Sequence, residues 1–254
     1  MGNSQSPSID HRFVSASRAF TPRELDELKS LFNSLASKSD VDGSFITRPV
    51  FMDYFELKGR LGDRAFDLIT QERKDGKLTL EDLVIFKSVY EKGTSVEIDE
   101  IAYRLIDITG DGVAERSDLE SVLQSIFEMI FSRGYEHSNS DMVKSILNAY
   151  ELNFFERKSS SEYMSLEDFR SWSASAPSVR KAIGSLLSPP ATGRPGFLVP
   201  NLKHEKNQEE ILLKEEHAWH IGGAISVAEL GKWTLLYNSA VNGLSFNTFF
   251  TSIS

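Results

Sequence analysis

Apolar residues recur at helical spacing through most of the chain, in short runs that are separated by polar breaks. The first run follows Thr21 and consists of Leu25, Leu28, Leu31, Phe32 and Leu35. Spacings of three and four residues place side chains on one face of an α-helix. Thr21 and Glu24 stand at the start of this run in the pattern of a capping box. We therefore predict a mainly helical protein that begins after a flexible leader over residues 1–20.

The same order of elements occurs four times along the chain: a helix, a break that contains one apolar residue, and a second helix. Aligned on that apolar residue, the breaks start at Ser39, Gln71, Asp107 and Arg157, and their eighth residues are Ile46, Leu78, Ala114 and Met164. Repetition of this kind marks a repeated supersecondary unit. The units resemble EF-hands, which join in pairs through a short ladder at the eighth loop residue. We expect one pair over 21–90 and a second over 95–185, which form two lobes.

One break, from Asp107 to Asp118, has an oxygen atom at every position that a calcium loop uses. Such a loop binds through positions 1, 3, 5, 7, 9 and 12, and has glycine at position 6 for a sharp turn. The predicted ligands are Asp107, Thr109, Asp111, the carbonyl of Val113, Glu115 and Asp118. Asp118 is shorter than the usual glutamate, so we expect at most weak binding of one Ca²⁺ or Mg²⁺. A loop that is stable without metal stays open as the alternative.

The other three breaks lack this ligand set. The break that starts at Ser39 has no carboxylate at either end, and the one that starts at Arg157 begins with a cation. The break from Gln71 to Asp82 keeps its last carboxylate, but Arg73 stands at a ligand position. We expect these three loops to have a structural role.

Composition and the lack of catalytic motifs argue against several further functions. The net charge of −9 over 254 residues argues against nucleic-acid binding, which needs a concentrated basic face. The absence of cysteine removes disulfides and thiol nucleophiles. Neither a nucleophile elbow nor a phosphate-binding glycine loop is present, so we predict no enzymatic activity. His217 and His220 have a spacing that allows metal binding on a helix, although surface histidines are the commoner explanation.

The first six residues fit the pattern for N-myristoylation at Gly2 after removal of Met1. A short, polar and disordered start is the alternative. A single myristoyl chain binds membranes with a constant on the order of 10⁴ M⁻¹, which is marginal. We therefore expect reversible, peripheral attachment of a cytoplasmic protein to the cytosolic face of a membrane, with help from a protein partner.

The C-terminal quarter has a different character. Residues 186–210 are rich in proline and glycine and predict a linker. A short helix that contains Ala218 and Trp219 follows, and then two apolar stretches flank Asn242-Gly243. Asn-Gly between apolar strands is a strong β-hairpin signal, because both turn residues need positive φ.

This helix, the WTLLY strand and the NGLSFNTFF strand together resemble the opening of a TLDc domain, over residues 211–254. With the EF-hand-like units and the myristoylation pattern, the layout resembles that of the myristoylated EF-hand/TLDc proteins, which include the MTOR-associated lysosomal member and its plant relatives. TLDc domains continue beyond such a hairpin into a two-sheet β-sandwich. We therefore expect that this chain is truncated within the domain.

The resemblance implies a non-enzymatic adaptor at the lysosomal, vacuolar or plasma membrane, linked to V-ATPase regulation and TOR-type signalling. It implies partner binding, including V-ATPase subunits where the domain is complete, by Trp219, Trp233, Tyr237 and Phe246. The alternative is a calcium-responsive, calcineurin-B-like adaptor that uses loop 107–118 to expose apolar residues such as Phe86, Leu123 or Phe127. A factor in oxidative-stress resistance is a third interpretation.

Overall fold

The computed structural model describes residues 11–39, 42–71, 73–131, 141–148, 163–203 and 213–234, together with 236, 243, 245, 247 and 251. Helices carry most of this part of the chain, and its strands form three two-stranded sheets, which confirms the mainly α prediction. No helix among the described residues has both the length and the apolar composition of a bilayer span. The predictions for Gly2, Tyr237 and Phe246 lie outside these residues.

The N-terminal half forms two helix–loop–helix units that follow an additional helix. Its elements are α1 (His11–Ser17), α2 (Pro22–Ser39), β1 (Ile46–Thr47), α3 (Arg48–Tyr54), α4 (Gly59–Ile69), β2 (Lys77–Leu78) and α5 (Leu80–Lys92). Thr79 starts α5 with a complete capping box, in which it exchanges hydrogen bonds with Asp82.

The second half repeats this order. Its elements are α6 (Ser95–Ile106), β3 (Ala114–Glu115), α7 (Arg116–Phe131), a helix over 141–148, β4 (Tyr163–Met164), α9 (Leu166–Ser175) and α10 (Pro177–Ser185). Capping boxes again define helix starts, from Thr94 into α6 and from Ser165 into α9.

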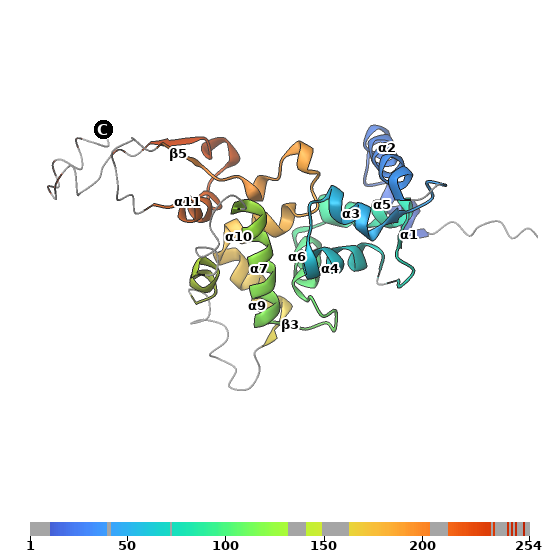
Figure 1. The fold of residues 1–254 in the computed structure, drawn as a ribbon, viewed down its shortest axis with the longest axis horizontal. Helices are drawn as coiled ribbons and strands as arrows, with labels where there is room; N and C mark the ends of the chain where they lie inside the picture. Colours follow the sequence, from blue (N-terminus) through green and yellow to red (C-terminus); the bar gives the residue numbers. More distant parts are fainter. Residues whose placement is uncertain are drawn as a thin grey trace, which may run out of the picture.

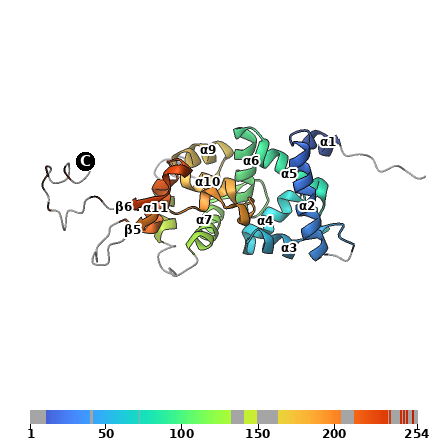
Figure 2. The ribbon, with the colours of Figure 1, turned by 90° about the horizontal axis from the view of Figure 1, so that it is seen from above.

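The last part of the described chain consists of η1 (Pro190–Thr192), η2 (Pro195–Phe197), β5 (Asn201–Lys203), α11 (Glu215–Gly222), η3 (Val227–Glu229) and β6 (Lys232–Thr234). In Figure 1, α1 to α5 gather at one end of the molecule and α7, α9, α10 and α11 at the other. The view from above places α6 between the two groups (Figure 2).

Two short antiparallel ladders join the loops in pairs. The first pairs Ile46 with Leu78, and the second pairs Ala114 with Met164. These four residues are the eighth positions of the aligned loops, so the predicted pairing of first with second and third with fourth loop is confirmed. One continuous apolar cluster contains residues from both pairs, from Phe32 of α2 to Trp219 of α11. The two pairs therefore share a core, and Tyr90 of α5 adds a 3.0 Å hydrogen bond to the carbonyl of Ile183.

Residues 11–20 differ from the expected leader. They begin with α1, which packs on α5, and a small cluster contains Ala16, Phe20, Leu28 and Val84. Phe13, Ala16 and Phe20 are spaced by three and four residues, so they face the same side of the segment. This pattern is short, because it covers two turns only, and it is surrounded by polar residues. That brevity explains why the sequence alone favoured a leader.

The stretch after α10 also differs from the expected linker, because it packs on the helical body. A Cβ atom at Gly196 would lie 2.2 Å from the backbone of Lys181 on α10, so only glycine allows this approach. Arg194 is buried, lies over the Phe197 ring and donates a hydrogen bond to the carbonyl of Phe55, which follows α3. This segment therefore connects α10 to the N-terminal half.

The segment that resembles the start of a TLDc domain docks on the same body through α11. Trp219 is 2% exposed, and its ring centroid lies 5.2 Å from that of Phe127 on α7. Its Nε1 donates a 2.8 Å hydrogen bond to the carbonyl of Gly196. Within the described residues, β6 pairs in parallel with β5, which places Trp233 opposite Leu202. Most of the second strand of the expected hairpin lies outside those residues.

Candidate functional site

Loop Asp107–Asp118 connects α6 to α7 and has the backbone form of a tight turn. Asp107 ends α6, and the two glycines of the loop, Gly110 and Gly112, have φ of +76° and +90°. Positive φ is strained for residues with a side chain, so both positions depend on glycine. Gly112 is the sixth residue of the loop, where a calcium loop needs its sharp turn.

The Asp107 carboxylate lies at the centre of the loop's hydrogen bonds. It is 2% exposed. It accepts hydrogen bonds from the amides of Gly110 at 2.8 Å and Gly112 at 3.0 Å, and from the Thr109 hydroxyl at 3.2 Å. These donors hold the loop around its first residue, as a cation-binding loop requires.

A residue of another helix–loop–helix unit also contacts this loop. Arg64 of α4 is buried, and its Nη2 lies 3.3 Å from Asp107 Oδ2. Its Nε donates to the carbonyl of Arg104 at 2.9 Å, so the guanidinium also contacts the end of α6. A cation at loop 107–118 must therefore share Asp107 with this guanidinium or displace it. The sequence carries a signal for this residue, since Arg64 lies on the same helical face as Leu61 and Leu68.

The remaining predicted ligands lie on the loop without converging. Asp118 is buried and accepts a 3.3 Å hydrogen bond from the amide of Glu115, while Asp111 accepts one from the amide of Val113 at 3.0 Å. Burial raises the pKa of Asp118, and the neighbouring charges of Glu115 and Asp107 add to this, against the opposing effects of the Glu115 amide and Arg60. In the described part of the chain, no three His, Asp or Glu side chains are arranged to hold a metal.

The donor set nevertheless fits a hard divalent cation, which prefers carboxylate, hydroxyl and carbonyl oxygens. Asp111 and Asp118 each accept one backbone hydrogen bond, which leaves carboxylate lone pairs for an ion. The Arg64 contact opposes binding, because two cations compete for one carboxylate. We therefore expect weak affinity from this competition, in addition to the short Asp118 side chain.

The described residues of the first loop are stabilised by hydrogen bonds of Ser39 and by ion pairs of Arg48 with Asp63 and Asp67 of α4. The hydroxyl of Ser39 accepts a 2.9 Å hydrogen bond from the amide of Thr47 and donates one to the carbonyl of Leu35 at 3.2 Å. In the second loop, Arg73 forms an ion pair with Asp82. The first half of the fourth loop, residues 157–162, lies outside the described residues.

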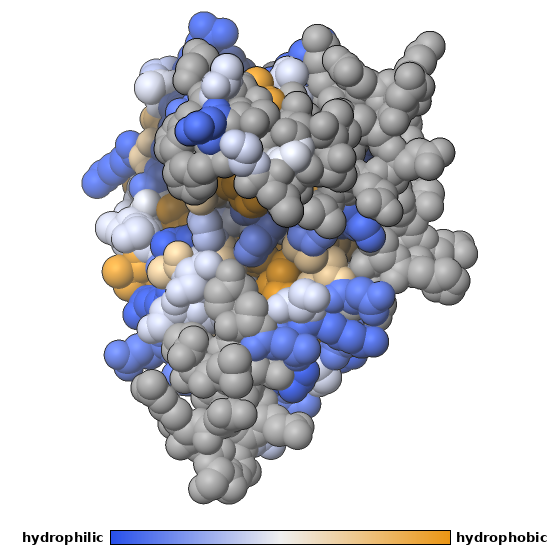
Figure 3. Space-filling model, turned by 90° about the vertical axis from the view of Figure 1, so that its left-hand side faces the viewer, coloured by the Kyte–Doolittle hydropathy of each residue, from blue (hydrophilic) through white to orange (hydrophobic). Residues whose placement is uncertain are grey.

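The aromatic residues that the TLDc resemblance implicates differ in accessibility. Trp219 is buried, whereas Trp233 is half-buried and donates from Nε1 to the carbonyl of Glu229 at 3.2 Å. Ile221 of α11 and Val227 of η3 are exposed, and the visible surface at this end of the molecule mixes apolar areas with hydrophilic ones (Figure 3). Partner binding by Trp219 would require α11 to leave the core.

Neither histidine of the HxxH pair lies in a metal cluster within the described chain. His220 Nδ1 lies 2.9 Å from the hydroxyl of Ser178 on α10. Burial lowers the pKa of His220, and the charge of His217 contributes. His217 accepts a hydrogen bond from the amide of Lys214 at the start of its own helix. His220 therefore contacts α10, and His217 caps the start of its own helix.

The apolar residues of the calcium-responsive alternative lie in two places, the buried core and the wall of a cavity. Leu123 and Phe127 are fully buried. Phe86 of α5 lines a cavity of about 230 Å³ between α4, α5 and α6, together with Leu68 and Ile101. This cavity is an apolar site that is open without rearrangement.

Comparisons with known proteins support the EF-hand resemblance. No family model matches the chain. It is 29% identical over 108 residues to the calcium-binding protein NCSA of Dictyostelium discoideum, which covers 41% of this chain and 56% of that protein. It is 30% identical over 89 residues to a recoverin family protein of the same organism, with 35% and 39% covered. The chain thus spans about half or less of the length of these relatives, and neither match bears on the TLDc domain or on lipidation.

Proposed function

We propose that this chain is a non-enzymatic, EF-hand-type adaptor that responds to a single divalent cation in loop Asp107–Asp118. The observation that carries the proposal is the geometry of Asp107, which backbone amides hold at the start of a loop with left-handed Gly112 at its sixth position. The names of the two distant relatives, a calcium-binding protein and a recoverin family protein, support the same function.

When bound, Ca²⁺ or Mg²⁺ would supply positive charge between the end of α6 and the start of α7. Asp107, Thr109, Asp111, Val113, Glu115 and Asp118 would hold it. Arg64 sets how strongly the loop binds the cation, because its guanidinium contacts the Asp107 carboxylate. Arg64 also belongs to α4, whose Leu68 and Ile69 line the cavity of about 230 Å³. The residue that competes with the ion therefore connects the loop to the open apolar site.

Calorimetric titration with calcium is expected to show one weak site per chain, which Asp107→Ala or Asp111→Ala removes; the absence of binding heat would contradict the proposal. Asp111 is exposed, so its replacement tests the loop without disturbing the core. Asp75→Ala is the matched control, because it removes a carboxylate from the loop that contains Arg73 and should leave the binding heat unchanged. Two or more tight sites, or a site that survives both loop variants, would contradict the assignment.

Membrane attachment through a myristoyl group on Gly2 is a second proposal, which the N-terminal pattern alone supports. Location at the lysosomal, vacuolar or plasma membrane, binding to V-ATPase subunits and a part in TOR-type signalling follow from the TLDc resemblance. Co-sedimentation of the lipidated protein with vesicles is expected to fall several-fold in Gly2→Ala, since one acyl chain supplies most of the membrane affinity. Equal sedimentation of both proteins would refute this proposal.

A further inference from the structure

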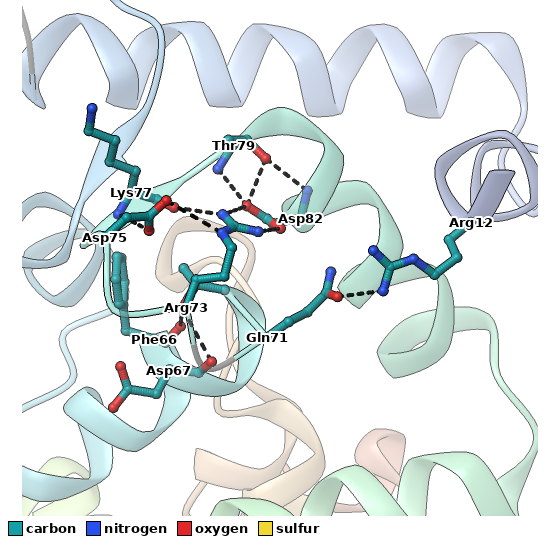
Figure 4. Close-up of polar contacts among 10 residues, drawn as sticks. Arg12, Phe66, Asp67, Gln71, Arg73, Asp75, Lys77, Thr79 and Asp82 are labelled. Carbon is teal, nitrogen blue, oxygen red and sulfur yellow. Dashed lines mark hydrogen bonds and ion pairs between the residues drawn. The ribbon is translucent and has the colours of Figure 1, made fainter. Parts of the chain in front are cut away.

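Arg73 stands at the third position of loop Gln71–Asp82, where a calcium loop has a ligand. Its Nη1 and Nη2 each lie 2.6 Å from an oxygen of Asp82, the twelfth residue of the loop. Nη2 also donates to the carbonyl of Lys77 at 3.0 Å, and Nε lies 3.5 Å from Asp75 Oδ2 (Figure 4). Lys77 and Asp75 are the seventh and fifth residues. The guanidinium thus contacts oxygens at three of the positions that would coordinate calcium.

The loop around this guanidinium has kept the form of a calcium loop. Gly76 at the sixth position has φ of +67°. Asp75 accepts a 3.1 Å hydrogen bond from the amide of Lys77, and Leu78 at the eighth position makes the ladder with Ile46. The backbone turn, the ladder and two carboxylates are therefore present, and a guanidinium lies among them where a calcium loop would hold its ion.

Asp82 is fixed as a ligand would be. It is 3% exposed, and it accepts hydrogen bonds from the Thr79 amide at 2.9 Å and the Thr79 hydroxyl at 2.7 Å. Burial alone would raise the pKa of Asp82, but its hydrogen bonds from Arg73 and Thr79 outweigh burial and lower it. An ordinary surface ion pair joins two side chains, and it contributes little. Here a two-pronged Arg–carboxylate pair is combined with a backbone carbonyl and a second carboxylate.

We propose that Arg73 is the built-in cation of loop Gln71–Asp82, and that it closes a latent divalent-cation site. The guanidinium joins the middle of the loop to Asp82 at the start of α5, as a bound ion would. The N-terminal pair of hands therefore keeps its form at any calcium concentration, and so does the wall of the apolar cavity that α4 and α5 contribute. This role does not depend on whether loop 107–118 binds an ion.

The test replaces Arg73 by a residue that offers a neutral oxygen. Arg73→Asn is expected to lower the midpoint of thermal unfolding in chelator by roughly 3–6 °C, which corresponds to the loss of one well-formed ion pair in a chain of this size. Millimolar calcium should reverse this shift. Calorimetry with calcium, or terbium luminescence, should show one more bound ion per chain than the wild type shows.

Two controls isolate the loop. The double variant Arg73→Asn, Asp82→Asn keeps the first change but lacks the twelfth ligand, so it should gain no ion. Arg23→Asn removes the same charge from an exposed position on α2 and should behave as the wild type does. The proposal is overturned when Arg73→Asn binds no more ions than the wild type does, or when either control gains the ion as well.

Arg73→Lys covers the case in which Arg73→Asn does not fold under either condition. Lysine keeps the charge as a compact point without the two-pronged geometry. The proposal requires this variant to fold in chelator and to bind no additional ion. Failure to fold there, or the gain of an ion, overturns it.

Discussion

Replacement of Arg64 by methionine is expected to raise the affinity of loop 107–118 for calcium at least tenfold. The guanidinium and the ion compete for Asp107, so removal of Arg64 frees the carboxylate. Methionine has a similar length and suits the apolar surroundings of α4. The same change should destabilise the calcium-free protein by about 3 kcal/mol, because it leaves a buried carboxylate without its counter-charge. Hydrogen bonds from Gly110, Gly112 and Thr109 keep the loss at the lower end of the range for such pairs.

Chemical denaturation with and without calcium measures both effects in one experiment. Calcium should restore most of the lost stability of Arg64→Met, and each 1.4 kcal/mol that it restores corresponds to about tenfold in affinity. Lys58→Met is the matched control, since it removes a positive charge from the exposed start of the same helix. Unchanged affinity in Arg64→Met would show that Arg64 does not compete for Asp107. The short Asp118 side chain would then be the remaining cause of the weak affinity.

The pairing of the loops could be predicted from the sequence because it depends on local rules. The eighth residue of each loop is fixed by loop length, and an apolar residue is found there in all four copies. The register that pairs Ile46 with Leu78, and Ala114 with Met164, follows from these positions. The capping boxes at Thr79 and Ser165 define helix starts for the same reason, since their partners lie three residues away.

The two arginines that shape the loops show what local rules leave out. Arg73 could be recognised as an obstacle to metal binding, but the sequence does not say that its side chain turns back on Asp82. Arg64 lies 43 residues from Asp107, and only the packing of α4 against α6 brings them together. Charged residues at long range are placed by tertiary structure, so the chemistry of loop 107–118 depended on a residue that no motif contains.

The sequence motifs of the C-terminal segment predicted its short helix, but they did not predict how that helix packs. Trp219 belongs to a short helix, as expected, but the burial of its ring depends on Phe127 of α7 and on the backbone at Gly196. Gly196 had suggested a linker, because glycine and proline interrupt regular structure. Its missing side chain instead permits close contact with α10. Composition alone does not separate these two uses of glycine.

Trp219→Ala is expected to destabilise the protein by about 3–5 kcal/mol, which is typical for removal of a fully buried aromatic side chain. The ring fills the space next to Phe127 and Phe131, with centroid distances of 5.2 and 6.4 Å, and its Nε1 satisfies the carbonyl of Gly196. Loss of the ring leaves a cavity and an unpaired carbonyl at the same place. Both effects weaken the contact of α11 with α7 and with the stretch after α10.

Denaturation experiments and limited proteolysis together distinguish this structural role from the partner-binding role that the TLDc resemblance implies. A structural Trp219 predicts a large loss of stability in Trp219→Ala and rapid cleavage near α11, because an undocked helix exposes its backbone. Trp233→Ala is the matched control, as its half-buried ring lies on β6 and its removal should change stability by less than about 1 kcal/mol. If Trp219→Ala were as stable as the wild type, the ring would not hold α11 on the core, and the residue would be free to serve a partner.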